Sequence, residues 1–169
     1  MFRKIRLSRT IFILSLVIIN VGCDQVSKSI VRERVEYHDY IEVIQDYMTL
    51  TKVENSGAFL GMGSDLHPGL RTIVMLILPA IALTIMLFLL IYKTSLPSAM
   101  IIGICFMLGG GIGNIIDRFR YGAVTDFLHI DLGLFQTGIF NLADVSIMIG
   151  ASMLFIYTLV HKNKPEQQT

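Results

Sequence analysis

The sequence has few charged residues, few cysteines and few histidines, and each of these scarcities excludes a class of function or site. Only 16% of the 169 residues are charged, the net charge is +1, and the basic residues form no single face that would bind nucleic acid. The four histidines lack the paired spacing of zinc sites. Cys23 and Cys105 both lie in apolar runs and match neither a metal site nor a disulfide framework. We therefore expect no metal, no other cofactor and no nucleic-acid partner.

Apolar residues, in contrast, are abundant and come in long blocks. They make up 53% of the chain, and the mean hydropathy is +0.65. A helix of about 20 apolar residues is long enough to cross a bilayer. The sequence predicts a single domain over residues 1–169, an all-α polytopic membrane protein with four transmembrane helices at about residues 8–31, 73–92, 98–116 and 139–160.

The segment 32–72 between the first two spans has a different character. Ile41–Ile44 and Met48–Val53 are rich in β-branched residues that partly alternate with polar ones, and Asn55-Ser56-Gly57 follows as a turn signal. We expect a small extramembrane β-sheet here. Basic residues gather in the N-terminal tail, at Lys93 between the second and third spans, and after the fourth span at Lys162 and Lys164. By the positive-inside rule both termini are cytoplasmic, which puts the sheet on the outer, periplasmic face.

Asp144 is the most informative residue, because it lies inside the otherwise uncharged fourth span. An ionised carboxylate in a membrane span is costly and is usually functional. A second acid, Asp126, lies just before the same span, and Asn141 precedes Asp144 by three residues on the same helical face. Two carboxylates near one membrane surface suit aspartyl-type hydrolysis. Three alternatives compete with this interpretation. Asp144 could pair with a basic neighbour to hold the helices together, or serve as the relay acid of a small proton- or ion-coupled transporter. The protein could also be a non-catalytic assembly factor, which has no particular use for paired acids.

The N-terminus resembles a lipoprotein signal peptide, with a basic start, an apolar stretch and Val21-Gly22-Cys23. Asn20 occupies the position three before the cysteine, where such signals have an aliphatic residue, and three more spans follow. We interpret Cys23 as an ordinary buried helix residue rather than a lipidated N-terminus.

Five motifs follow one another along the chain. They are Asp24-Gln25-Val26-Ser27-Lys28, Asn55-Ser56-Gly57-Ala58-Phe59, Gly110-Gly111-Ile112-Gly113-Asn114-Ile115-Ile116-Asp117-Arg118, Val124-Thr125-Asp126-Phe127 and Phe140-Asn141-Leu142-Ala143-Asp144. In this order, on a four-span protein, the series resembles the lipoprotein signal peptidases (signal peptidase II) of bacteria. The resemblance extends from Asp24 to Ile149.

The resemblance implies an aspartyl endopeptidase of the bacterial inner membrane. Such an enzyme removes the signal peptide from prolipoproteins on the amino side of a cysteine that already carries diacylglycerol, and is inhibited by globomycin-type cyclic peptides. Its partners would be prolipoproteins and membrane lipid. Asp126 and Asp144 would be the catalytic pair. The substrate-binding or supporting polar positions would be Asn55, Gly57, Asn114, Asp117, Arg118 and Asn141, with Asp24 and Lys28 paired at the outer end of the first span.

Several local expectations accompany this resemblance. We expect Asn141 to orient Asp144 and Asp117 to form a boundary ion pair with Arg118. Gly110 and Gly113 would allow close helix contact. The chain departs from the family pattern at Phe59-Leu60 and at Leu128-His129-Ile130-Asp131, which leaves the roles of His129 and Asp131 open.

Overall fold

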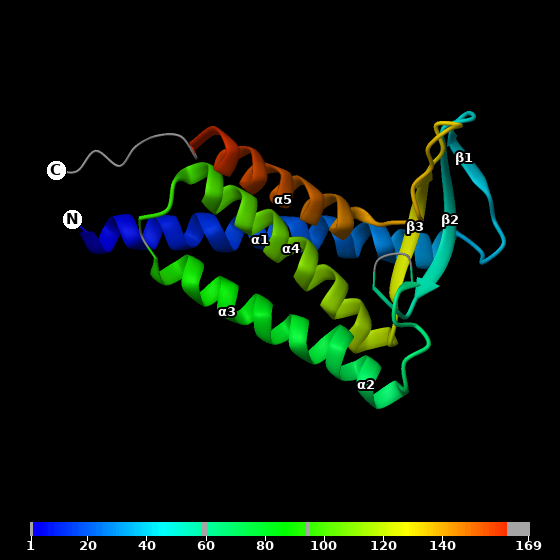
Figure 1. Ribbon diagram of the computed structural model, residues 1–169, viewed down its shortest axis with the longest axis horizontal. Helices are drawn as coiled ribbons and strands as arrows, with labels where there is room; N and C mark the ends of the chain where they lie inside the picture. Colours follow the sequence, from blue (N-terminus) through cyan, green and yellow to red (C-terminus); the bar gives the residue numbers. More distant parts are fainter. Residues whose placement is uncertain (1, 59–60, 94, 162–169) are drawn as a thin grey trace.

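Four apolar helices lie lengthwise beside one another and a small sheet crosses one end of them (Figure 1). The computed structural model describes residues 2–58, 61–93 and 95–161, so Phe59, Leu60, Lys162 and Lys164 lie outside the described residues. Within the described part, four segments are long and apolar enough to cross a membrane: Leu7–Arg34, Pro68–Tyr92, Ser98–Tyr121 and Leu142–His161. The predicted architecture of four spans and a small sheet is confirmed.

The first three spans are longer than the apolar runs that predicted them, whereas the fourth begins later than expected. Helix α1 covers Phe2–Arg34, α4 covers Ser98–Tyr121 and α5 covers Leu142–His161. Helix α4 passes the expected end at Ile116 because its last turns are polar but still helical. It ends at Gly122, whose φ of 76° is the left-handed conformation that closes many helices.

The second span is continuous from the sheet side to the far end. It consists of α2 (Pro68–Thr72), a π-helical turn (Ile73–Ile77) and α3 (Leu78–Tyr92). Pro79 lies just after the π-helical turn. A proline ring would collide with the carbonyl four residues earlier in a regular α-helix, and the wider turn accommodates it.

Helix α4 is the central element and packs against α1, α3 and α5. Its glycines allow these close approaches, as expected. A Cβ on Gly110 would collide with the main chain at Ala143 of α5, and one on Gly113 would collide with the Asp24 side chain of α1. Outward-facing apolar side chains are widely exposed, as Ile18 and Phe155 illustrate, which suits contact with lipid. Cys23 belongs to α1 but is exposed, so its predicted burial is wrong.

Among the described residues the sheet has three antiparallel strands, β1 (Ile41–Ile44), β2 (Met48–Asn55) and β3 (Val124–Ile130), in the order β1-β2-β3. The first two match the predicted strands, whereas β3 was not predicted. It pairs Asp126 with Val53 and Thr125 with Glu54. Strand β3 also bonds to Phe140, which explains why α5 begins at Leu142 instead of Ile139.

The helix contact at Gly110 gives a direct test of this packing. We expect Gly110→Ala to lower the free energy of unfolding by about 1–3 kcal/mol, because the methyl group has no space against α5. Gly22→Ala is the matched control, since nothing lies within 4 Å of a Cβ at Gly22 and alanine is the better helix former. Melting curves in detergent compare the two variants, and a Gly110→Ala protein as stable as the control would contradict the packing.

Candidate active site

The two predicted catalytic acids meet where the sheet joins the helices. Asp126 lies on β3 and is 3% exposed, and Asp144 lies in the first turn of α5 and is partly exposed. The side chain and main chain of Asn141 contact both carboxylates. Asp126 and Asp144 belong to different elements of the chain, and these contacts bring them together at one end of the bundle.

Two amide groups hold the Asp126 carboxylate. Asn141 Nδ2 donates to Oδ1 at 2.6 Å and Asn55 Nδ2 donates to Oδ2 at 3.0 Å. Each oxygen therefore has one neutral donor. Asn55 is itself fixed by the turn that follows β2, because its Oδ1 accepts the main-chain N–H of Gly57 at 3.0 Å. The amide nitrogen then donates both to the carboxylate and, at 3.1 Å, to the main-chain oxygen of Ala58.

Asp144 has a different set of donors from the one expected. Asn114 Nδ2 donates to its Oδ1 at 2.9 Å, and the main-chain N–H of Asn141 donates to its Oδ2 at 3.2 Å. The Asn141 side chain instead accepts the main-chain N–H of Asp144 at 3.0 Å, which caps α5. Asn114, rather than the Asn141 side chain, is thus the amide that orients the Asp144 carboxylate.

Lys28 determines which way the Asn114 amide points. Its ammonium group is fully buried and donates to Asn114 Oδ1 at 2.9 Å. A lysine ammonium group has only donors, so the amide oxygen must face it and the amide N–H groups must face away. They therefore face the Asp144 carboxylate. Lys28 also forms the expected ion pair with Asp24 at 2.9 Å and a second with Asp117 at 3.1 Å.

Asp117 connects this ion network to β3. Arg32 Nη2 lies 2.8 Å from its Oδ1, and the main-chain N–H of Thr125 donates to its Oδ2 at 3.2 Å. Thr125 is the residue before Asp126, so Asp117 holds the strand that carries the catalytic candidate. The expected ion pair between Asp117 and Arg118 is replaced by these contacts, because Asp117 points toward α1.

Asp24 connects the same network to α5. Its Oδ1 accepts the main-chain N–H of Ala143 at 2.9 Å, and Gln25 Nε2 donates to its Oδ2 at 3.1 Å. The first N–H groups of a helix lack partners within the helix and form the positive end of its dipole. A buried carboxylate at this point fixes the start of α5, one residue before Asp144.

Arg118 also interacts with both acids. Its Nη2 donates to the main-chain oxygen of Gly57 at 2.7 Å, and its positive charge interacts with the carboxylates of both Asp126 and Asp144. Gly57 has no space for a side chain, since a Cβ would lie 2.6 Å from the main-chain oxygens of Gly61 and Met62. The turn after β2 and the end of α4 thus close around the site.

The pKa of Asp126 is raised to about 6. Burial is the main cause, and the nearby negative charge of Asp144 adds to it; the hydrogen bonds from Asn55 and Asn141 and the charge of Lys28 oppose it. A carboxyl group with this pKa exchanges protons readily near neutral pH. Asp126 can therefore serve as a proton donor or as a proton acceptor at a pH near 6.

Arg32 and Thr125 complete the network but were not predicted as site residues. The available signal for Thr125 was the run of β-branched and aromatic residues from Val124 to Ile130, bounded by Gly122 and Gly133. Asp131 lies outside the site, where its carboxylate accepts the N–H of Gly133 at 2.8 Å in an exposed turn. No three His, Cys, Asp or Glu side chains of the described residues cluster as metal ligands.

Known proteins are similar to this chain in both sequence and fold. The family model described as signal peptidase II matches residues 16–160. The lipoprotein signal peptidase of Halothermothrix orenii is 36% identical over 83% of this chain and 90% of its own length. That of Borrelia hermsii is 35% identical over 91% of both chains. A solved structure described as a bacterial membrane enzyme superposes with a TM-score of 0.82 and 26% identity, covering 94% of this chain and 93% of the other.

The family match begins within the first span and extends through the sheet and both acids into the last turn of the fourth span. With relatives above 30% identity over most of the chain, the resemblance expected from the five motifs is confirmed. This multi-pass membrane protein belongs to the signal peptidase II family of bacterial peptidases.

Proposed function

We propose that this protein is an aspartyl endopeptidase that removes the signal peptide from diacylglyceryl-modified prolipoproteins. The observation that carries the proposal is the pair formed by Asp126 and Asp144, two carboxylates held by separate amide donors around Asn141. Family membership supplies the reaction class, peptide-bond hydrolysis. Cleavage would fall on the amino side of the lipid-modified cysteine.

The chemistry needs one neutral and one ionised carboxyl group. The ionised group takes a proton from water as the water oxygen attacks the scissile carbonyl carbon, while the neutral group donates its proton to the carbonyl oxygen. The C–N bond then breaks, and a proton passes to the amino group of the departing cysteine. The products are a signal peptide with a new carboxylate and a lipoprotein with a new amino terminus. Either carboxyl group of the pair could take either role, so neither role is assigned to one residue.

Arg118 would assist by stabilising negative charge as it moves between the two carboxyl groups and the carbonyl oxygen. Its position is fixed by the Gly57 main-chain oxygen, so the charge is already in place when the substrate arrives. Gly57 would serve by letting the turn pack closely, and Asn114 and Asn141 by holding the two acids in reacting geometry.

The location of the site supports a substrate that enters from the lipid. Figure 1 shows that α1 starts and α5 ends at one end of the bundle, and that the sheet lies at the other end. Asp126 belongs to β3 and so lies at the sheet end. With both termini cytoplasmic, the acids lie near the periplasmic surface. There an extended peptide can reach the acids while the diacylglyceryl chains of its cysteine remain in the membrane. Globomycin-type inhibitors would bind the same place.

Replacing either acid tests the catalytic pair. We expect Asp126→Asn and Asp144→Asn each to reduce cleavage by at least about a hundredfold, because an amide keeps the shape but neither takes up nor donates the required proton. The measurement is the cleavage rate of a diacylglyceryl-modified prolipoprotein by purified protein in detergent, followed by gel mobility. A parallel reaction with the unmodified precursor reports the dependence on lipid.

Asp131→Asn is the matched control, since this acid lies in an exposed turn and should retain the wild-type rate. Near-normal cleavage by either variant of the proposed pair, in protein that melts as the wild type does, would rule out the aspartyl mechanism.

The raised pKa of Asp126 also predicts a pH dependence. The value of kcat/KM, which reports the free enzyme, should fall as the pH rises through about 6. Above that pH the Asp126 carboxyl group loses the proton that the reaction needs. Asn141→Ala removes a donor that favours the ionised form, so the pKa of Asp126 should rise and the fall in kcat/KM should move up by about one pH unit.

Asn20→Ala serves as the control for this profile, because Asn20 bonds to Leu16 and Ser146 and contacts neither acid. A profile for Asn141→Ala that matches the Asn20→Ala profile, or moves to lower pH, would show that Asn141 does not act on Asp126.

A further inference from the structure

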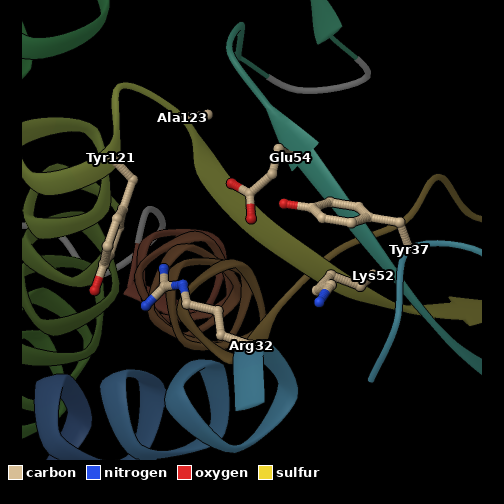
Figure 2. A pocket seen from close by; sticks show the side chains of 6 residues that line it. All are labelled: Arg32, Tyr37, Lys52, Glu54, Tyr121 and Ala123. Atoms are coloured by element: carbon tan, nitrogen blue, oxygen red, sulfur yellow. The ribbon is translucent and has the colours of Figure 1, made fainter. Parts of the chain in front are cut away.

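A cavity of about 450 Å³ lies beside the sheet, on the face opposite Asp126 (Figure 2). Successive side chains of a strand point to opposite faces, and Thr125 precedes Asp126 on β3. The Thr125 hydroxyl accepts from Arg32 Nε at 2.9 Å and donates to Glu54 at 3.0 Å, and both partners line the cavity. The complete lining is Arg32, Tyr37, Lys52, Glu54, Tyr121 and Ala123.

The cavity lies at the depth of the lipid head groups. Arg32 is in the last turn of α1, and Tyr121 is the last residue of α4. Near the other end of α1, Arg9 bonds to the carbonyl groups of Leu90 and Lys93 at the end of α3. At 1.5 Å per residue, Arg9 and Arg32 are separated by about 35 Å along the helix, slightly more than the roughly 30 Å hydrocarbon core of a bilayer. Arg32 therefore lies just beyond the hydrocarbon.

The cavity carries a positive charge without an acidic partner. Lys52 is 7% exposed, and its Nζ lies 4.4 Å from the centre of the Tyr37 ring. Among the described residues no carboxylate lies within ion-pairing distance of it. The side chain is largely buried but lines the cavity, and a cation–π contact leaves its ammonium group free to pair with an anion that enters there.

Arg32 supplies a second cation and Glu54 an anion in the same space. The Arg32 guanidinium stacks over the Tyr121 ring at 4.1 Å and is directed by Asp117 and Thr125. Figure 2 shows the Tyr37 hydroxyl pointing toward the Glu54 side chain. A purely anionic ligand would be repelled by Glu54, and a purely cationic one by Lys52. The lining matches a ligand that has a negative and a positive group close together.

We propose that this cavity binds the head group of a zwitterionic phospholipid of the phosphatidylethanolamine type. Its phosphate would contact Lys52 and Arg32, and its primary ammonium group would contact Glu54. The volume falls within the range of small-ligand sites. Helices α1 and α4, which supply Arg32 and Tyr121 to the cavity, also carry exposed apolar side chains that offer a surface for the acyl chains: Val26, Ile30 and Phe119. The site is separate from the catalytic pair and does not depend on the proposed cleavage reaction.

Lipid binding to delipidated protein in dodecyl maltoside, measured by native mass spectrometry, tests this proposal. Phosphatidylethanolamine and phosphatidylglycerol with identical chains are titrated separately, and the wild type should bind the former at least about fivefold more tightly. Lys52→Met should weaken phosphatidylethanolamine binding about tenfold, since it removes a charge-assisted contact to the phosphate. Lys52→Arg should retain the binding. Glu54→Gln should abolish the preference between the two lipids.

Arg34→Met and Glu33→Gln are matched controls, because both side chains are exposed at the same end of α1 and neither lines the cavity. Both should bind as the wild type does. Soluble glycerophosphoethanolamine should bind far more weakly than the lipid, and equal binding would overturn the lipid as the source of the head group. Equal affinity of the wild type for the two lipids, or unchanged binding by Lys52→Met, would overturn the proposal itself.

Discussion

The fully buried ammonium group of Lys28 is the interaction on which the rest of the site depends. It contacts Asp24, Asp117 and Asn114, three residues that have little else in common. Breaking a buried ion pair by removing one partner costs about 3–5 kcal/mol, whereas exchanging the whole set for apolar residues is often neutral. The network therefore need not make the folded protein more stable than apolar side chains in its place would. Its use is geometric, because each of its three contacts fixes a different part of the site.

Each contact leads by one further step to one of the two proposed catalytic acids. Asn114 turns its amide N–H groups to Asp144, Asp117 bonds to the N–H before Asp126, and Asp24 bonds to the N–H before Asp144. Helices α1, α4 and α5 and strand β3 are thus joined by one set of charges. The same network requires a glycine at position 113, since any side chain of Gly113 would displace Asp24. Small residues on α4 and charges on α1 are two parts of one arrangement.

The helices, the first two strands and the acids could be predicted because each has a local signal. Apolar runs mark the spans, β-branched residues mark Ile41–Ile44 and Met48–Val53, and a carboxylate in an apolar run stands out at Asp144. The contacts could not be predicted in this way. Which asparagine side chain donates to the Asp144 carboxylate depends on where Lys28 lies. Asp117 turns toward Arg32 because α1 packs beside α4. Such contacts join residues far apart in the sequence and follow from packing alone.

Strand β3 shows why a sheet is needed beside a helical bundle at this position. A helix places neighbouring side chains about 100° apart, so two successive residues share a broad surface. A strand sends them to opposite faces, and β3 uses this to separate two environments. Thr125 faces Arg32 and Glu54, and Asp126 faces the amides of Asn55 and Asn141. The charges that hold the strand are thereby kept on one face, while neutral donors surround the acid on the other. Asp126 keeps a raised pKa mainly because it is buried, and the hydrogen bonds from the two neutral amides and the charge of Lys28 lower the pKa only in part.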